Sequence, residues 1–236
     1  MNAIIRNLPN AITCSNLFCG CISCYMGFQG LYKLALLFIV IGAVFDFFDG
    51  MTARILKVSS NIGKELDSLA DDITFGLAPS VIAFSLFSEM VYPELLQPIA
   101  EYIPFTAFLI SVFSALRLAK FNLDERQTSS FIGMPTPANA LFWGSLAITI
   151  KDFDLLNTAW VNPVTMFILV VVMSLLLVCE LPMFSLKFKN LSWKDNQTSY
   201  IFILVTIPLI LFLRISGLAA TIAWYIVLSL VAYRRK

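Results

Sequence analysis

Long apolar stretches separated by short polar ones run the length of the sequence. A helix needs roughly 20 residues to cross a hydrocarbon core about 30 Å thick, and these stretches are close to that length. Lipid offers no partners for backbone polar groups, so apolar runs of this kind form helices and not open strands. The pattern predicts eight helices, near residues 12–29, 31–53, 70–92, 103–121, 137–151, 163–181, 198–214 and 216–233.

Composition supports an all-α integral membrane protein. Hydrophobic residues make up 59% of the chain and charged residues 13%. Soluble domains usually carry about a quarter charged residues, so this chain is not an ordinary soluble globule. No repeat, low-complexity tract or soluble segment interrupts the pattern, which predicts a single membrane domain over residues 1–236.

Basic residues are distributed unevenly between the two sets of connecting segments. Cytoplasmic segments of membrane proteins carry an excess of lysine and arginine. If both termini are cytoplasmic, 13 of the 16 basic residues lie on the cytoplasmic side, and only Lys33, Lys151 and Arg214 lie on the other. The opposite loops instead carry acidic residues. This asymmetry supports an even number of crossings and places the segment between the second and third predicted helices in the cytoplasm.

That segment and the helix ends beside it hold four regularly spaced aspartates. Asp46 and Asp49 are three residues apart, and Asp67 and Asp71 are four apart, so each pair shares one helix face. Acidic groups at membrane depth are costly and indicate function. Four carboxylates packed together would repel one another unless cations lay between them. Carboxylate oxygens suit Mg²⁺ or Mn²⁺, and two such ions could bind a phosphate or pyrophosphate group.

Histidine is absent from the chain, so proton transfer would fall to carboxylates or other side chains. Small residues near the aspartates leave room for a nucleotide, and Arg54 could neutralise a phosphate. The alternative is that the small residues serve helix packing and that Arg54 is an ordinary cytoplasmic flanking charge. Asn10, Thr13 and Asn16 recur at three-residue spacing on one helix face, either to bind the nucleotide or to bond to neighbouring helices. Asp72, next to Asp71, is interpreted as a solvated charge at the start of a helix; the alternative is that it supports the neighbouring carboxylates that bind the metal.

The pattern D-x2-D-G-x2-A-R-x8-G-x3-D-x3-D is complete, at Asp46, Asp49, Gly50, Ala53, Arg54, Gly63, Asp67 and Asp71. It resembles the signature of the CDP-alcohol phosphotransferase family. The resemblance implies a donor such as CDP-diacylglycerol and release of CMP. It also implies metal binding by Asp46, Asp49 and Asp67, with Asp71 as general base and a further metal neighbour. Gly50, Ala53, Arg54 and Gly63, with Asn10 and Thr13, are then expected to bind the CDP group.

Segments that flank or overlap the signature resemble the membrane-embedded phosphatidylserine synthases of this family. They are LPNAITCSNLFCG at 8–20, LDSLADDITFGLAPS at 66–80, RLAKFN at 117–122 and FIGMPTPANA at 131–140, with a weaker match in LPMFSLKFK at 181–189. The resemblance implies L-serine as acceptor and a homodimer in the cell membrane. It leaves the last two helices, at 198–233, accessory.

A zwitterionic acceptor needs a cationic group for its carboxylate. Arg117, Lys120 and Asn122 lie at the end of the fourth predicted helix, on the same side as the aspartates, and are candidates for this role. The alternative is that Arg117 and Lys120 are topology-determining charges, and the same alternative holds for Lys187 and Lys189. Two alternatives remain: the same fold with another acceptor, such as glycerol 3-phosphate, an inositol phosphate or an amino alcohol, and a cation or proton transporter. The transporter would need carboxylates at the bilayer midplane and broken helices in two halves, neither of which the pattern contains.

Overall fold

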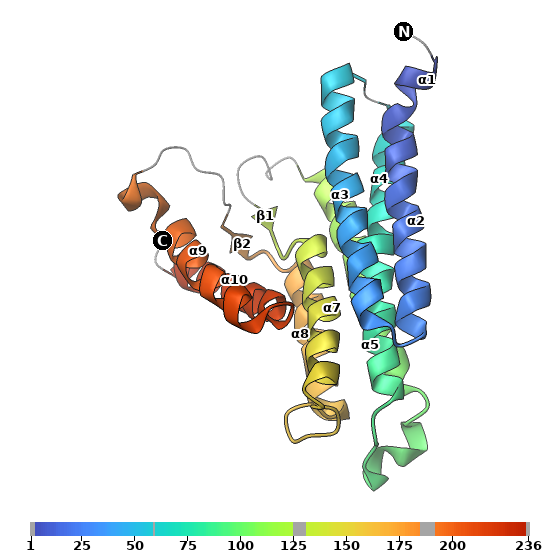
Figure 1. The fold of residues 1–236 in the computed structure, drawn as a ribbon, viewed down its shortest axis with the longest axis vertical. Helices are drawn as coiled ribbons and strands as arrows, with labels where there is room; N and C mark the ends of the chain where they lie inside the picture. Colours follow the sequence, from blue (N-terminus) through green and yellow to red (C-terminus); the bar gives the residue numbers. More distant parts are fainter. Residues whose placement is uncertain (1–2, 59, 125–130, 185–191, 235–236) are drawn as a thin grey trace.

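A computed structural model of the chain describes residues 3–58, 60–124, 131–184 and 192–234. It is an elongated bundle of helices (Figure 1). The helices run in the order α1 (Ala3–Arg6), α2 (Leu8–Phe28), α3 (Tyr32–Leu56), α4 (Asn61–Asp71), a π-helical turn η1 (Asp72–Leu77), α5 (Ala78–Ser88), the 3₁₀ turns η2 (Glu94–Ile99) and η3 (Ile103–Phe108), α6 (Leu109–Leu123), α7 (Thr136–Asp152), α8 (Pro163–Val178), α9 (Trp193–Leu213) and α10 (Ser216–Arg234).

The prediction of a helical membrane protein is confirmed. Six helices of the described chain are long and apolar enough to cross a membrane, and α8 is a shorter apolar helix. The fold contains almost no sheet: β1 (Phe131–Ile132) pairs with β2 (Pro182–Met183) as two short antiparallel strands. The predicted helices near 12–29, 31–53, 137–151, 163–181 and 216–233 each match one helix of the structure to within a few residues at either end.

The predicted start of the third helix was wrong. The structure runs α4, η1 and α5 together as one helix from Asn61 to Ser88, nine residues earlier than the predicted start at residue 70. The Ser60 hydroxyl caps this helix by accepting a hydrogen bond from the Gly63 backbone N–H, at 3.0 Å. The first turns are polar on one face, so hydropathy did not detect them. Asp67 and Asp71 therefore lie well inside the helix and are held by its regular backbone.

Three helices pack side by side at the N-terminal half of the chain: α2, α3 and the continuous α4–α5 helix (Figure 1). Glycines allow the close approach. A Cβ atom at Gly20 would lie 2.9 Å from the Thr74 Cα, and one at Gly42 would lie 2.7 Å from the Thr74 Cγ2. Helix α7 covers another side of this group and supplies its most deeply buried large side chain, Trp143. The contacts fix α3 and α4, which carry the aspartates, against α2.

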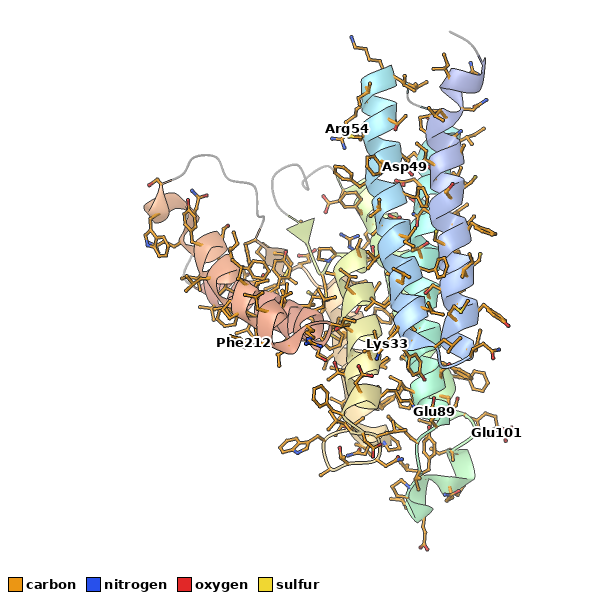
Figure 2. The ribbon with its side chains drawn as sticks, in the orientation of Figure 1. Lys33, Asp49, Arg54, Glu89, Glu101 and Phe212 are labelled. Atoms are coloured by element: carbon orange, nitrogen blue, oxygen red, sulfur yellow. The ribbon has the colours of Figure 1, made fainter. Side chains whose placement is uncertain are left out.

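The last two helices lie to one side of this bundle and are inclined to it (Figure 1). Helix α10 packs against α7 and β2, and α9 packs on α10 at the outer edge. Phe212 of α9 is 85% exposed and is drawn pointing outward (Figure 2). Such apolar exposure is expected of a surface in contact with lipid.

Charged side chains gather at the two ends of the bundle. Figure 2 shows Asp49 and Arg54 toward one end, and Lys33, Glu89 and Glu101 toward the other. At the second end, Glu89 accepts a hydrogen bond from the Tyr32 hydroxyl at 2.9 Å and pairs with Lys151. Lys33 pairs with Asp152 at 2.9 Å. These contacts join α3, α5 and α7 at the end opposite the aspartates.

Candidate active site

Two helices bring the signature aspartates together. Asp46 and Asp49 lie in the second half of α3, and Asp67 and Asp71 lie one turn apart on α4. One carboxylate oxygen from each of Asp46, Asp49 and Asp67 lies within 4.8 Å of the other two. Asp71 lies one turn after Asp67 on the same helix and is close enough to Asp46 to interact with it electrostatically. The structure thus assembles all four aspartates that the sequence singled out.

The chemistry of this cluster fits divalent cations. Carboxylate oxygens of Asp46, Asp49 and Asp67 lie within 4.8 Å of one another, a separation at which ionised groups repel unless a cation lies between them. The buried Asp67 Oδ1 has no hydrogen-bond partner among the described residues. A buried, unpartnered carboxylate oxygen beside two other carboxylates is the donor set that Mg²⁺ or Mn²⁺ prefers. The described residues therefore fit a metal centre.

Helix α2 supplies polar side chains that contact two of the aspartates. The Thr13 hydroxyl lies 2.6 Å from Asp49 Oδ2 and donates to it. The Asn16 amide donates to Asp71 Oδ1 at 3.2 Å. Both α2 side chains are buried. The three-residue spacing seen in the sequence thus places one α2 face against the carboxylates, where it orients them.

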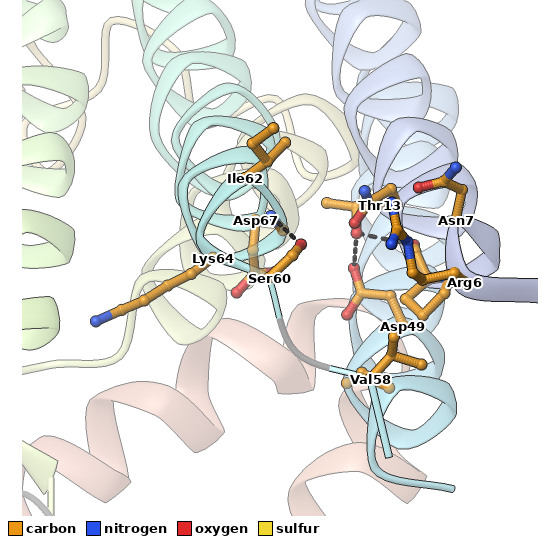
Figure 3. A pocket seen from close by; sticks show the side chains of 14 residues that line it. Arg6, Asn7, Thr13, Asp49, Val58, Ser60, Ile62, Lys64 and Asp67 are labelled. Carbon is orange, nitrogen blue, oxygen red and sulfur yellow. Dashed lines mark hydrogen bonds between the residues drawn. The ribbon is translucent and has the colours of Figure 1, made fainter. Parts of the chain in front are cut away.

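A cleft of about 580 Å³ opens beside the aspartates, between the ends of α2, α3 and α4. Figure 3 shows Thr13 and Asp49 on one side of it and Ser60, Ile62 and Asp67 on the other. Five of the six residues expected at the CDP group line this cleft: Asn10, Thr13, Gly50, Ala53 and Gly63. Its volume lies in the range of small-molecule sites.

The sixth residue, Arg54, is exposed and does not line the cleft. Its Nε donates to the Gly50 carbonyl oxygen of its own helix at 3.0 Å. Lining residues that the sequence analysis missed include Arg6, Asn7, Ser60 and Lys64. Arg6 was counted only as a cytoplasmic charge. The Lys64 ammonium donates to the Asn122 carbonyl oxygen on α6, so this side chain extends away from Thr13 and Asp49 (Figure 3).

The three acceptor candidates on α6 occupy different surroundings. Arg117 is only 7% exposed, whereas Lys120 is exposed. The Asn122 amide donates to the Ser68 hydroxyl at 2.7 Å and so joins α6 to α4. Arg117 Nη1 lies 3.5 Å from the Thr136 hydroxyl of α7. Lys187 and Lys189 lie outside the described residues.

The sequence predicted Asp72 as a solvated charge, and this prediction was wrong. Its side chain is half-buried, and Asp72 Oδ1 is buried without a hydrogen-bond partner among the residues described. A Cβ atom at Gly76 would lie 2.6 Å from that oxygen and 3.0 Å from the Ser114 Cβ. The side chain therefore packs along η1 toward α6. The π-helical turn that begins at Asp72 is what brings it there.

The fold and site define a helical membrane protein with a cluster of carboxylates, suited to divalent cations, next to a nucleotide-sized cleft. The chain matches the family described as CDP-alcohol phosphatidyltransferase over residues 6–232, and it belongs to that family. Among curated proteins, it is 40% identical over 135 residues to the CDP-diacylglycerol–serine O-phosphatidyltransferase of Bacillus subtilis (strain 168), covering 55% of this chain and 69% of that protein. It is 27% identical over 228 residues to the Helicobacter pylori (strain ATCC 700392 / 26695) protein of the same name, covering 95% and 90%. A Saccharomyces cerevisiae (strain ATCC 204508 / S288c) protein, also so named, is 34% identical over 156 residues, covering 57% of this chain and 52% of the relative.

Proposed function

We propose that this protein transfers the phosphatidyl group of CDP-diacylglycerol to the hydroxyl of L-serine, giving phosphatidylserine and CMP. The observation that carries the proposal is the aspartate cluster at the edge of a nucleotide-sized cleft. Support for the acceptor comes from the Bacillus subtilis and Helicobacter pylori relatives, whose names specify serine.

Asp46, Asp49 and Asp67 would hold Mg²⁺ or Mn²⁺, with two ions as the proposed number and Asp71 beside them. When bound, such ions offset the charge of the pyrophosphate group. The cytidine and phosphates would occupy the cleft along Asn10, Thr13, Gly50, Ala53 and Gly63. A Cβ atom at Gly50 would meet only Arg54 Nη2, at 3.8 Å, so this helix surface is open to a ligand. Arg54 is then proposed to turn from the Gly50 carbonyl oxygen to a phosphate.

Asp71 is the proposed general base. Asn16 donates to its Oδ1, which leaves the second carboxylate oxygen to accept a proton. In the proposed reaction, the serine hydroxyl oxygen forms a bond to the phosphorus that bears the diacylglycerol. The bond from that phosphorus to the CMP oxygen breaks, CMP leaves with the electron pair, and the hydroxyl proton passes to Asp71. Positioned proton transfer of this kind contributes about 10²–10⁴-fold in rate.

Arg117 is the proposed partner of the serine carboxylate. It is a buried cation, and its Nε has no hydrogen-bond partner among the described residues. An unpaired buried charge is costly, so a bound carboxylate that accepts from the guanidinium would be favoured. Its helix, α6, packs against η1, the turn that directly follows Asp71. A serine held here would have its hydroxyl on the side of the proposed base. Lys120 and Asn122 would form the rim of the same site.

The wider assignment follows from the family. We propose eight crossings, a single domain over residues 1–236, both termini and the active site on the cytoplasmic side of the cell membrane, and a homodimer. The polar cleft would then open toward the cytoplasm, where serine and CMP are soluble.

Acceptor choice tests the proposed function directly. Purified protein in detergent receives CDP-diacylglycerol and Mg²⁺ or Mn²⁺, with serine, glycerol 3-phosphate, inositol phosphate or choline in separate reactions. We expect CMP and phosphatidylserine with serine alone, and neither when EDTA removes the metal. CMP release with a different alcohol would keep the aspartate chemistry and reject serine. No CMP release with any acceptor from folded protein would reject the enzyme.

The base assignment predicts a separation between binding and turnover. Asp71→Asn preserves the shape of the side chain but cannot take up the proton, so we expect kcat to fall by about 10²-fold or more while CDP binding persists. Asp46→Asn removes a proposed metal ligand, so we expect the affinity of the enzyme for the metal ion and its affinity for the nucleotide to fall together. Turnover and CDP binding by calorimetry are measured side by side. Near-normal kcat in Asp71→Asn would reject Asp71 as the base.

A further inference from the structure

A closed ring of hydrogen bonds, the α4–α6 ring, joins the end of α6 to the first turns of α4 and is formed by Lys64, Ser68 and Asn122. The Lys64 ammonium donates to the Asn122 carbonyl oxygen at 3.2 Å, and the Asn122 amide donates to the Ser68 hydroxyl at 2.7 Å. The Ser68 hydroxyl in turn donates to the Lys64 carbonyl oxygen at 3.2 Å. Each of the three residues both donates and accepts, so the ring holds Asn122 in one position against α4.

The last turn of α6 depends on this ring for its attachment to α4. Helix α6 packs closely against η1 and α8 rather than against α4. The last four carbonyl groups of a helix have no partner within the helix, and such ends unwind easily unless other groups hold them. The Asn122 carbonyl oxygen is one of these groups, since α6 ends at Leu123. The Lys64 ammonium supplies its partner and places a positive charge at the negative end of the α6 dipole.

The same turn of α6 contacts the proposed serine-binding cation. Phe121 directly precedes Asn122, and the Arg117 guanidinium lies over its ring, with Cζ 5.4 Å from the ring centre. A cation within about 6 Å of an aromatic ring centre is attracted to the face of the ring. The position of the Phe121 ring therefore helps to fix the orientation of the guanidinium, and Phe121 belongs to the turn that the α4–α6 ring anchors.

On α4, the ring lies next to the aspartates of the active site. Ser68 directly follows Asp67, and Lys64 and Ser68 are one turn apart, as are Asp67 and Asp71. With 3.6 residues per turn, the two pairs occupy neighbouring faces of one helix. The ring thus holds the end of α6 beside the face of α4 that carries the proposed base.

We propose that Ser68 and Asn122 are positioning residues for acceptor binding. Their hydrogen bond fixes the last turn of α6, and with it the aromatic ring that supports the Arg117 guanidinium. The inference rests on the proposed function, because Arg117 is the group assigned there to the serine carboxylate. Asn122 then acts by holding α6 in place and does not itself bind serine. The nucleotide cleft lies between α2, α3 and α4, and neither Ser68 nor Asn122 lines it.

The test is Ser68→Ala, which removes the hydroxyl from the ring and leaves α6 itself unaltered. Loss of one hydrogen bond of this kind weakens an equilibrium by about 5-fold, so we expect the KM for serine to rise about 5-fold. The KM for CDP-diacylglycerol should stay unchanged. Ser68→Thr keeps a hydroxyl at this position and should restore the wild-type KM for serine. A merely structural role would lower the amount of active enzyme without changing the KM for serine, or would raise both KM values together, and either result would overturn the inference.

Ser88→Ala is the matched control. Ser88 lies on the same continuous helix, and its hydroxyl also donates to the carbonyl oxygen four residues earlier, that of Phe84, at 3.0 Å. It lies next to Glu89, at the end of the bundle opposite the aspartates. Both variants lose the same bond within the helix, and Ser68→Ala also loses the bond to α6. Only Ser68→Ala should therefore raise the KM for serine, and an equal rise in both variants would overturn the inference.

A double-mutant cycle with Asn122→Ala shows whether the two residues act as a pair. Asn122→Ala removes the other partner of the same hydrogen bond and keeps the main-chain carbonyl oxygen to which Lys64 donates. If the pair acts as a unit, the double variant should have a KM for serine close to that of either single variant. Effects that multiply would overturn the inference. A rise in Asn122→Ala with no change in Ser68→Ala would also overturn it, because Asn122 would then contact serine directly. Wild type that is inactive with serine would instead reject the proposed function.

Discussion

Thr13 and Asn16 show how individual side chains of α2 complete a site whose carboxylates come from α3 and α4. Each donates to a different aspartate, Thr13 to Asp49 and Asn16 to Asp71. Groups that orient a metal ligand typically alter metal affinity or activity by 10–100-fold when they are removed. The α2 face is therefore expected to set how strongly the aspartates bind cations and how Asp71 is oriented.

Thr13→Val tests the contribution of this hydroxyl. Valine has nearly the same shape but cannot donate to Asp49 Oδ2, so we expect the concentration of Mg²⁺ or Mn²⁺ needed for half-maximal activity to rise about 10-fold or more. Metal titration of CMP release measures it. Thr149→Val is the control, because the Thr149 hydroxyl donates to the Ser145 carbonyl oxygen, away from the site. Equal metal dependence in both variants would contradict the role of Thr13.

For individual residues, the sequence predicted which side chains form the site better than it predicted which of them contact one another. The aspartate spacing indicated a metal site, and the three-residue spacing of Asn10, Thr13 and Asn16 indicated one helix face. Which hydroxyl or amide meets which carboxylate depends on how far α2 is shifted along α3 and α4, and the sequence does not encode that shift in any local pattern.

Helix contacts around Thr74 set the depth at which α2 and α3 pack against η1. A Cβ atom at Gly20 would lie 2.4 Å from the Thr74 hydroxyl oxygen and 3.0 Å from the Thr74 backbone nitrogen. Backbone atoms of a packed helix cannot move aside as a flexible side chain can. Asp71 lies three residues before Thr74 on the same continuous helix, so this contact also affects the site.

Gly20→Ala should therefore separate α2 from η1. Overpacking of this kind costs about 1–3 kcal/mol, so we expect a lower thermal midpoint in detergent and reduced activity. Gly50→Ala is the control for stability: it also replaces a helical glycine, but its Cβ would meet only Arg54 Nη2, at 3.8 Å. Alanine is favoured over glycine in helices by about 1 kcal/mol, so the control midpoint should not fall. A Gly20→Ala midpoint equal to wild type would contradict tight packing here.

The ends of a helix were predicted well where hydropathy alone determines them. They were predicted poorly where local polar contacts determine them. The ends of α2, α3 and α7 follow their apolar stretches. The start of α4 depends instead on the Ser60 cap, and no sequence pattern indicated the π-helical turn of η1. The inclination of α9 and α10 to the bundle also had no sequence signal, because both helices are apolar all around.

In the whole molecule, basic residues line the cleft and acidic residues lie at the opposite end of the bundle. This distribution of charge indicates how the protein is oriented in the membrane. Arg6 and Lys64 line the cleft beside the aspartates, whereas Glu89, Glu94 and Glu101 follow α5 at the other end. Lysine- and arginine-rich segments remain on the cytoplasmic side during insertion. The arrangement supports our proposal that the cleft faces the cytoplasm, where its water-soluble substrate and product are found.

Cysteine labelling tests this orientation. Leu95, in η2, is 90% exposed at the acidic end, and Leu123, at the end of α6, is 84% exposed near the aspartates. In a background with the five native cysteines replaced by alanine, a membrane-impermeant maleimide should label Leu95→Cys in intact spheroplasts. It should label Leu123→Cys only after lysis, because that end faces the cytoplasm. The reverse pattern would place the cleft outside the cell, away from cytoplasmic serine, and would contradict the orientation inferred from charge while leaving the aspartate chemistry intact.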